Sequence, residues 1–212
     1  MTEPAEATKA EQPRKAELLL VAATRLFTQR GIAAVSVKDI AKEAGATIPT
    51  LYRAWEGGKP ELVVVTLGQW SEDHLAKLQA ALQAGGDGPQ RLDRLFAFLA
   101  SWSRRRGFRG SYIMNAAAEL TTLAAMDPKA EAAAREVIKE HQQAEHRLLL
   151  KFAQSIDAAD PDGLADQLQL IWYGAIDRAR LSSAKRRKEV VETARAIAHA
   201  MLDQAAPTPV QQ

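Results

Sequence analysis

A short stretch after residue 45 carries side chains whose chemistry suits a nucleic-acid duplex. Threonine and tyrosine hydroxyls can hydrogen-bond to phosphate oxygens, arginine can reach a phosphate or a guanine edge, and isoleucine or proline can contact a thymine methyl group. The segment ATIPTLYRAW supplies all of these groups together. The side chains that we expect to face DNA are those of Thr47, Ile48, Pro49, Thr50, Tyr52 and Arg53.

Capping residues predict two short helices that would position this stretch. Ser36 and Asp39 have the spacing of a capping box, with Asp in place of the usual Glu or Gln. Gly45 ends that helix, Thr47 can cap the next one, and Pro49 lies in its first turn. Two short helices joined by a turn of about three residues form a helix-turn-helix, whose second helix can lie in the DNA major groove.

An amphipathic helix is expected before this pair, over residues 14–31, because RKAELLLVAATRLFTQRG gathers apolar residues on one face and ends in glycine. That face contains Leu19, Ala22, Ala23, Leu26 and Phe27. In the third helix Leu51 and Trp55 are four residues apart and are expected to pack inward.

The remaining sequence also has helical periodicity, and no alternation typical of a strand persists. Glycine, proline and aspartate breaks divide the chain into about nine helices, so we predict an all-α fold. The first three helices are short and the later ones long, which places a domain boundary near residue 58. The later helices are expected at 60–83, 89–106, 111–125, 128–157, 162–181 and 185–204.

Composition limits the possible functions. The 212-residue chain has no cysteine, which excludes disulfides, thiolate metal sites and cysteine nucleophiles and fits a reducing compartment. The polar N-terminus does not resemble a secretion signal, and no apolar stretch reaches the roughly 20 residues that cross a bilayer. We therefore expect a soluble cytoplasmic protein without membrane contact. The net charge is only +2, so any nucleic-acid contact must use a local basic surface.

The segment LFTQRGIAAVSVKDIAKEAGATIPTLYRAW resembles the signature of the TetR (tetracycline repressor) family of transcriptional regulators. In that signature, LF-x-x-x-G precedes a D-I-A-x-x-A-G turn and a T-L-Y-x-x-F/W recognition helix. The resemblance covers about residues 14–65 and is specific, because many spaced positions agree at once. It implies a homodimeric repressor that binds a palindromic double-stranded operator and releases it when a small-molecule effector binds the C-terminal domain.

With the boundary from helix lengths, the expected domains are a three-helix DNA-binding domain at 13–59 and a helical ligand-binding and dimerisation domain at 60–206, with disordered tails at 1–12 and 207–212. It implies that Tyr52 and the lysine after the recognition helix, here Lys59, contact phosphates. This chain departs from many members because the segment WEGGK at 55–59 is one residue longer and Ala54 replaces a polar residue. A glycine pair lets the backbone adapt to such an insertion.

In the second domain, RGSYIMNAAAEL resembles a segment of the form R-G-x-x-x-x-N-A-A-A-E from one broad group of these regulators. A pocket in a helical bundle needs apolar walls and a few polar groups. The candidate ligand-binding residues are Phe98, Trp102, Tyr112, Met114, Asn115, Glu119 and Trp172. Asn115 and Glu119 are four residues apart and could bind a ligand or each other, and the aromatic residues could equally be ordinary core.

The last two predicted helices have apolar faces that suit a four-helix dimer interface, or that pack only within the subunit. These faces contain Leu164, Leu168, Ile171, Ala175, Ile176, Val190, Val191, Ala194, Ile197, Ala198 and Met201.

Metal and enzyme functions find little support in the sequence. His141 and His146 are five residues apart and point away from one another on a helix, and Glu140 and Glu145 do not complete a ligand set, so we expect surface residues and no metal site. No cofactor or catalytic residue is expected. Two alternatives to a regulator stay open: a helical small-molecule-binding protein that no longer binds DNA, and an enzyme.

Overall fold

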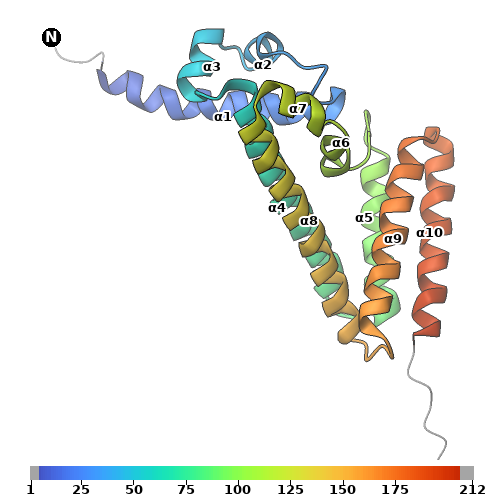
Figure 1. Ribbon diagram of the computed structural model, residues 1–212. Coiled ribbons are helices and arrows are strands. Elements are labelled where there is room, and N and C mark those ends of the chain that lie inside the picture. The colour runs from blue at the N-terminus through green and yellow to red at the C-terminus, as the bar shows by residue number, and fades with distance from the viewer. Residues whose placement is uncertain (1–4, 206–212) are drawn as a thin grey trace, which may run out of the picture. The chain divides into compact units, whose positions relative to one another are not determined.

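The computed structural model describes residues 5–205, with side chains from Arg14 onward. Ten α-helices and no strands are found among these residues, which confirms the all-α prediction and corrects the expected number of about nine (Figure 1). The predicted tail at 207–212 lies outside the described residues. Of the predicted tail at 1–12, residues 1–4 also lie outside them, and only the backbone of the rest is described. No helix in the described part has the length and apolar character needed to cross a membrane.

The helix bounds agree with most of the expected segments. In chain order the helices are α1 (Ala5–Arg30), α2 (Val37–Glu43), α3 (Ile48–Ala54), α4 (Gly58–Gln83), α5 (Gly88–Ser103), α6 (Tyr112–Ala118), α7 (Leu120–Met126), α8 (Pro128–Gln154), α9 (Pro161–Arg180) and α10 (Ala184–Gln204).

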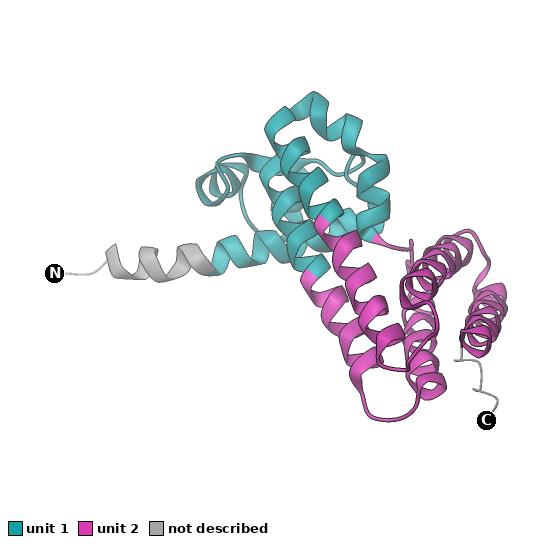
Figure 2. Ribbon diagram, turned by 60° about the horizontal axis from the view of Figure 1, so that its bottom comes forward, with its two compact units in different colours: residues 1–71, 112–139 teal, residues 72–111, 140–212 magenta. Residues whose placement is uncertain are grey.

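The chain forms two compact units (Figure 2). The first unit comprises the chain up to Ser71 together with Tyr112–Lys139, and the second comprises Glu72–Ser111 and the chain from Glu140 onward. The long helices α4 and α8 therefore each contribute residues to both units. The predicted division of the chain into one domain at 13–59 and another at 60–206 stays a prediction.

The core of the first unit is formed by the predicted apolar face of α1 packed against its neighbours. Leu19, Leu26 and Phe27 are each at most 2% exposed, and they pack in one cluster with buried residues of the later helices, such as Ile40 and Leu51. Burying each side chain of this size contributes about 1.5–3 kcal/mol. This packing is what stabilises α2 and α3, because helices of seven residues are too short to persist alone.

One predicted helix, 111–125, is broken in two at Glu119, which separates α6 from α7. The carboxylate of Glu119 accepts hydrogen bonds from the backbone N–H groups of Ile32, at 3.2 Å, and Ala33, at 2.6 Å, just after α1. The preceding Gly31 has φ +88°, and a Cβ there would lie 2.8 Å from Oε1 of Glu119. The helix is interrupted where this carboxylate binds the end of α1.

In the second unit, α10 packs against α9 and α5. Leu164, Leu168 and Ile176 of α9, with Val191 and Ala198 of α10, are at most 2% exposed in the core of a single chain. Much of the apolar face expected at a dimer interface is thus buried within the subunit. Part of it remains at the surface, since Ile197 is 40% exposed.

Replacing Gly31 with Ala should destabilise the first unit by two separate effects. A left-handed backbone conformation costs a residue with a side chain about 1–2 kcal/mol. Displacing the Glu119 carboxylate from two backbone donors adds roughly 1–3 kcal/mol to the loss of stability. Gly45→Ala is the matched control, because Gly45 has φ +62° but an added Cβ meets nothing within 4 Å. Urea unfolding followed by circular dichroism should show the larger loss for Gly31→Ala; equal losses would show that the Glu119 contact contributes nothing.

Candidate nucleic-acid interface

Helix α2 begins with the capping box that the sequence predicted. The Ser36 hydroxyl accepts a hydrogen bond from the Asp39 backbone N–H at 3.1 Å, and the Asp39 carboxylate accepts one from the Ser36 backbone N–H at 2.9 Å. The Ser36 hydroxyl also donates a hydrogen bond to the Asp39 carboxylate at 2.5 Å, and this bond, together with that from the Ser36 N–H, lowers the pKa of Asp39 below its ordinary value. Two of the backbone donors at the start of α2 are therefore satisfied, and the direction of the helix is fixed.

Helix α3 is capped by Thr47, again as predicted. The Thr47 hydroxyl accepts a hydrogen bond from the Thr50 backbone N–H at 3.3 Å and lies 2.8 Å from the Thr50 hydroxyl oxygen. Pro49 lies in the first turn, where the missing N–H has no helical partner to lose. Leu51 is fully buried against the core of the first unit, so one face of α3 is anchored and the opposite face is set toward solvent.

The outward face of α3 carries the residues that we predicted to contact DNA. Ile48 is 40% exposed and Tyr52 is 47% exposed, so both side chains are accessible at the surface of α3. Within the predicted set, Thr47, Ile48, Pro49, Tyr52 and Arg53 are exposed, whereas Thr50 is half-buried. The helix therefore presents hydroxyl, apolar and cationic groups together, as direct readout of a major groove requires.

The lengthened segment 55–59 is accommodated by Gly58. This glycine begins α4 with φ +61°, and a Cβ there would lie 2.7 Å from the Tyr52 ring. The Tyr52 ring therefore rests against the glycine backbone. The neighbouring Gly57 donates its N–H to the Glu61 carboxylate at 2.9 Å, which caps the first turn of α4.

Lys59 lies in the first turn of α4 and is only half-buried. Burial lowers its pKa, and the charge of Glu119 acts in the opposite direction. The contact of Lys59 with a phosphate stays a prediction, as do the base and phosphate contacts of the other residues.

The candidate ligand-binding residues are divided between the two units. Phe98, Trp102 and Trp172 form an aromatic cluster in the second unit, in which Phe98 stacks on Trp102 at 6.0 Å and on Trp172 at 6.3 Å between ring centroids. Trp172 is 1% exposed, and its indole N–H makes no hydrogen bond within the described residues. The structure therefore holds a buried donor among apolar rings, which suits a ligand with a hydrogen-bond acceptor.

The other four candidates belong to the first unit. Tyr112 is 2% exposed and its hydroxyl lies 3.0 Å from that of Thr66, so burial raises the pKa of Tyr112. The Glu119 carboxylate binds the backbone after α1. Met114 and Asn115, on α6, are half-buried. A ligand-binding role for these residues stays a prediction.

The expectation that His141 and Glu145 lie at the surface is wrong. They are 2% and 1% exposed, and His74 of α4 beside them is 5% exposed. On α8 these two residues continue an inward stripe that includes Leu149 and Phe152, at the three- and four-residue spacing of a buried face. His146, as expected, lies on another side of the helix from His141, and its Nε2 lies 2.9 Å from Oδ1 of Asp166.

Comparison with known proteins supports the interpretation of the first unit as a helix-turn-helix of a regulatory protein. Residues 19–64 match the family model described as bacterial regulatory proteins, tetR family. The HTH-type transcriptional repressor KstR2 of Rhodococcus jostii is 35% identical over 92 residues, which are 43% of this chain and 44% of that protein. The matched region thus spans less than half the length of this curated relative.

Solved structures extend the likeness to almost the entire chain. A TetR-family transcriptional regulator from Streptomyces coelicolor superposes with a TM-score of 0.79 at 26% identity, covering 92% of this chain and 97% of that one. The reduced form of NemR from Escherichia coli has a TM-score of 0.71 at 20% identity, over 93% and 100% of the two chains, which shows a shared fold. The chain has the helix-turn-helix architecture of a DNA-binding regulator. Its residues 19–64 match the tetR family of bacterial regulatory proteins, and its fold is shared with TetR-family regulators.

The capping role of Thr47 predicts a specific stability pattern. Thr47→Ala removes the oxygen that accepts the Thr50 N–H and should lower the free energy of unfolding by about 1 kcal/mol, whereas Thr47→Ser keeps the oxygen and should cost much less. Chemical denaturation of the two variants beside the wild type measures both values. Equal stability of the Ala and Ser variants would mean that the hydroxyl does not cap α3.

Proposed function

We propose that this protein is a transcriptional repressor that binds a palindromic operator as a homodimer and releases it when a small molecule binds the second unit. The observation that carries the proposal is the outward face of α3, which is rigidly capped, anchored by Leu51 and rich in groups that contact DNA. Similarity to a family of transcriptional regulators, rather than to enzymes, supports a non-catalytic role. Operator binding would place the protein in the cytoplasm.

The geometry of α3 favours docking of its N-terminal turn into the major groove. Thr47, Ile48 and Pro49 start the helix and would lie nearest the base edges, where Ile48 or Pro49 suits a thymine methyl group. Tyr52 and Arg53 follow one turn later and would contact the sugar–phosphate backbone or a guanine. Phosphate contacts position the helix, and the apolar and hydroxyl contacts provide sequence preference.

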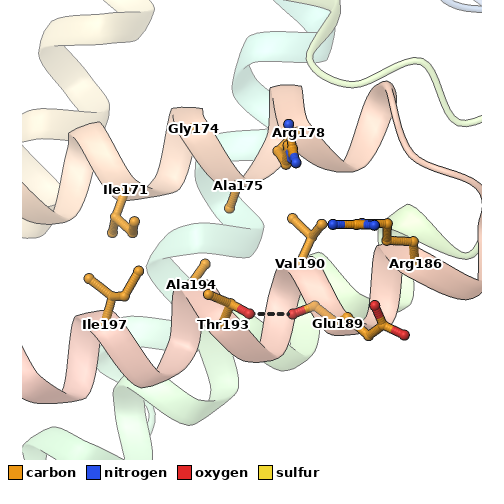
Figure 3. A pocket seen from close by; sticks show the side chains of 10 residues that line it. All are labelled: Ile171, Gly174, Ala175, Arg178, Arg186, Glu189, Val190, Thr193, Ala194 and Ile197. Atoms are coloured by element: carbon orange, nitrogen blue, oxygen red, sulfur yellow. Dashed lines mark hydrogen bonds between the residues drawn. The ribbon is translucent and has the colours of Figure 1, made fainter.

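Dimerisation would use the apolar groove that remains between α9 and α10. Figure 3 shows Ile171 of α9 and Ile197 of α10 pointing toward one another across this groove, with Val190 farther along it near Arg186. Arg178 and Arg186 line its charged end. Two helices from each of two copies would bury these side chains in a four-helix interface and separate the two α3 helices by about one DNA turn or a multiple of it.

Release by an effector requires that the ligand bind one conformation of the dimer more tightly than the other. A coupling free energy of about 1–3 kcal/mol changes operator affinity by roughly 5- to 150-fold. The stacked rings of Phe98, Trp102 and Trp172 support the second unit as the place where an apolar ligand with an acceptor group binds, since the Trp172 indole N–H has no hydrogen-bond partner among the described residues.

Operator binding can be tested with the DNA upstream of the protein's own gene and its neighbour. Fluorescence anisotropy at physiological salt should show tight binding of this DNA and weak binding of a scrambled duplex. Tyr52→Phe combined with Arg53→Ala should lower the affinity at least tenfold, because each good contact is worth about 1–3 kcal/mol. Arg105→Ala, an exposed arginine in the second unit, is the matched control and should bind normally. Selective binding that survives loss of both α3 side chains would contradict docking through α3, and no binding by the wild type would favour the small-molecule-binding alternative.

The dimer interface is tested by charge insertion. Ile197→Glu places a carboxylate in the α9–α10 groove and should shift the protein from dimer to monomer in sedimentation velocity, with loss of operator affinity. Ala196→Glu is the control, because Ala196 is exposed on the same helix but does not line the groove. A dimer that persists in Ile197→Glu would place the interface elsewhere.

A further inference from the structure

The second unit contains a buried cluster of three side chains that the proposed function does not use. Nε2 of His74, on α4, lies 3.3 Å from Oε1 of Glu145, and Nε2 of His141, one turn before Glu145 on α8, lies 3.5 Å from the same oxygen. All three side chains are at most 5% exposed. Their ligand atoms lie within 4.8 Å of one another.

The two oxygens of Glu145 have different surroundings. Oε2 accepts a short hydrogen bond from the Tyr173 hydroxyl, and Gln169 donates its side-chain N–H to the Tyr173 oxygen at 3.2 Å and to the Gln142 backbone carbonyl at 3.0 Å. Oε1 accepts no hydrogen bond from the described residues, although both imidazole nitrogens face it. The carboxylate is therefore held in place through one oxygen while the other is directed at two nitrogen atoms.

The two nitrogen–oxygen distances in the cluster match those between ligands of a tetrahedral metal ion. Zinc binds imidazole nitrogen at roughly 2.0–2.1 Å and carboxylate oxygen at roughly 2.0–2.2 Å, so two ligand atoms of a tetrahedron are separated by roughly 3.3–3.5 Å. The two nitrogen–oxygen separations fall in this range and are longer than good charge-assisted hydrogen bonds. The residues are thus spaced as donors around a common centre.

We propose that His74 Nε2, His141 Nε2 and Glu145 Oε1 bind one divalent first-row transition-metal ion, of the type of Zn²⁺, in the second unit. Two imidazoles and a carboxylate favour such an ion over Mg²⁺ or Ca²⁺, which prefer oxygen ligands throughout. Three protein ligands leave a fourth position for water or another small donor. This inference does not depend on DNA binding.

Burial of the cluster also favours a bound cation. An ionised carboxylate that is removed from water needs a compensating charge, and Glu145 is 1% exposed. A metal ion at the centre that both imidazole nitrogens face would supply that charge.

The surroundings resemble the outer layer of a metal site. Tyr173 and Gln169 orient the carboxylate as the outer hydrogen-bonding residues of metal centres do. The His74 ring lies 5.2 Å from the ring of Trp102 and 5.7 Å from that of Phe98, between centroids, so apolar rings surround the ligands. Apolar surroundings strengthen the attraction between ion and carboxylate.

The test is a metal titration of the full chain, after removal of any affinity tag and dialysis against a chelator. Isothermal titration with ZnCl₂ should give one ion per chain, Mg²⁺ should give none, and Co²⁺ should give the intense visible absorption of tetrahedral coordination. His141→Ala and Glu145→Gln should each weaken Zn²⁺ binding at least 100-fold. Tyr173→Phe should weaken it about 10- to 100-fold, because it removes only the residue that positions the carboxylate.

His146→Ala is the matched control, since His146 lies on the same helix beside Asp166 but outside the cluster, and this variant should bind Zn²⁺ as the wild type does. Circular dichroism checks that each variant keeps its helical content, and where a ligand variant fails to fold, Tyr173→Phe and the Co²⁺ spectrum of the wild type decide. Absence of stoichiometric binding, wild-type affinity in the folded cluster variants, or loss of binding in His146→Ala would overturn the proposal.

Discussion

The hydrogen bonds from the backbone of Ile32 and Ala33 to the Glu119 carboxylate are the constraint on which the first unit depends. Helices α2 and α3 have seven residues each and persist only because they pack against α1 and its neighbours. The turn that leads from α1 into α2 would leave polar N–H groups without partners, and the carboxylate supplies the acceptor. The break between α6 and α7 falls at the same glutamate, and the contact of its carboxylate with Gly31, which has φ +88°, leaves no room for a Cβ there.

Features governed by neighbours in the sequence were predicted correctly. The capping box of Ser36 and Asp39, the Thr47 cap, and the buried face of α1 each follow from residues within a few turns of one another, and the structure confirms them. The break at Glu119 could not be predicted in this way. Its partners lie 86 and 87 residues away along the chain, and nothing local distinguishes this glutamate from one on a helix surface.

The histidine cluster is a second feature that neighbours in the sequence could not predict in full. His141 and Glu145 are spaced i, i+4 on one helix face, a pattern that could have indicated two ligands, but the third member comes from α4. The aromatic residues of the second unit were selected by size and type, and three of them do lie together. Tyr112 instead belongs to the core of the first unit.

The contact between Tyr52 and Gly58 links the recognition helix to the start of α4 without an intervening side chain. The ring rests on backbone, which cannot change rotamer or yield as a flexible side chain would. A movement of the first turn of α4 toward α3 would therefore push directly on the Tyr52 ring. Gly58 thus couples the start of α4, a helix of 26 residues, directly to an aromatic side chain on the outward face of α3.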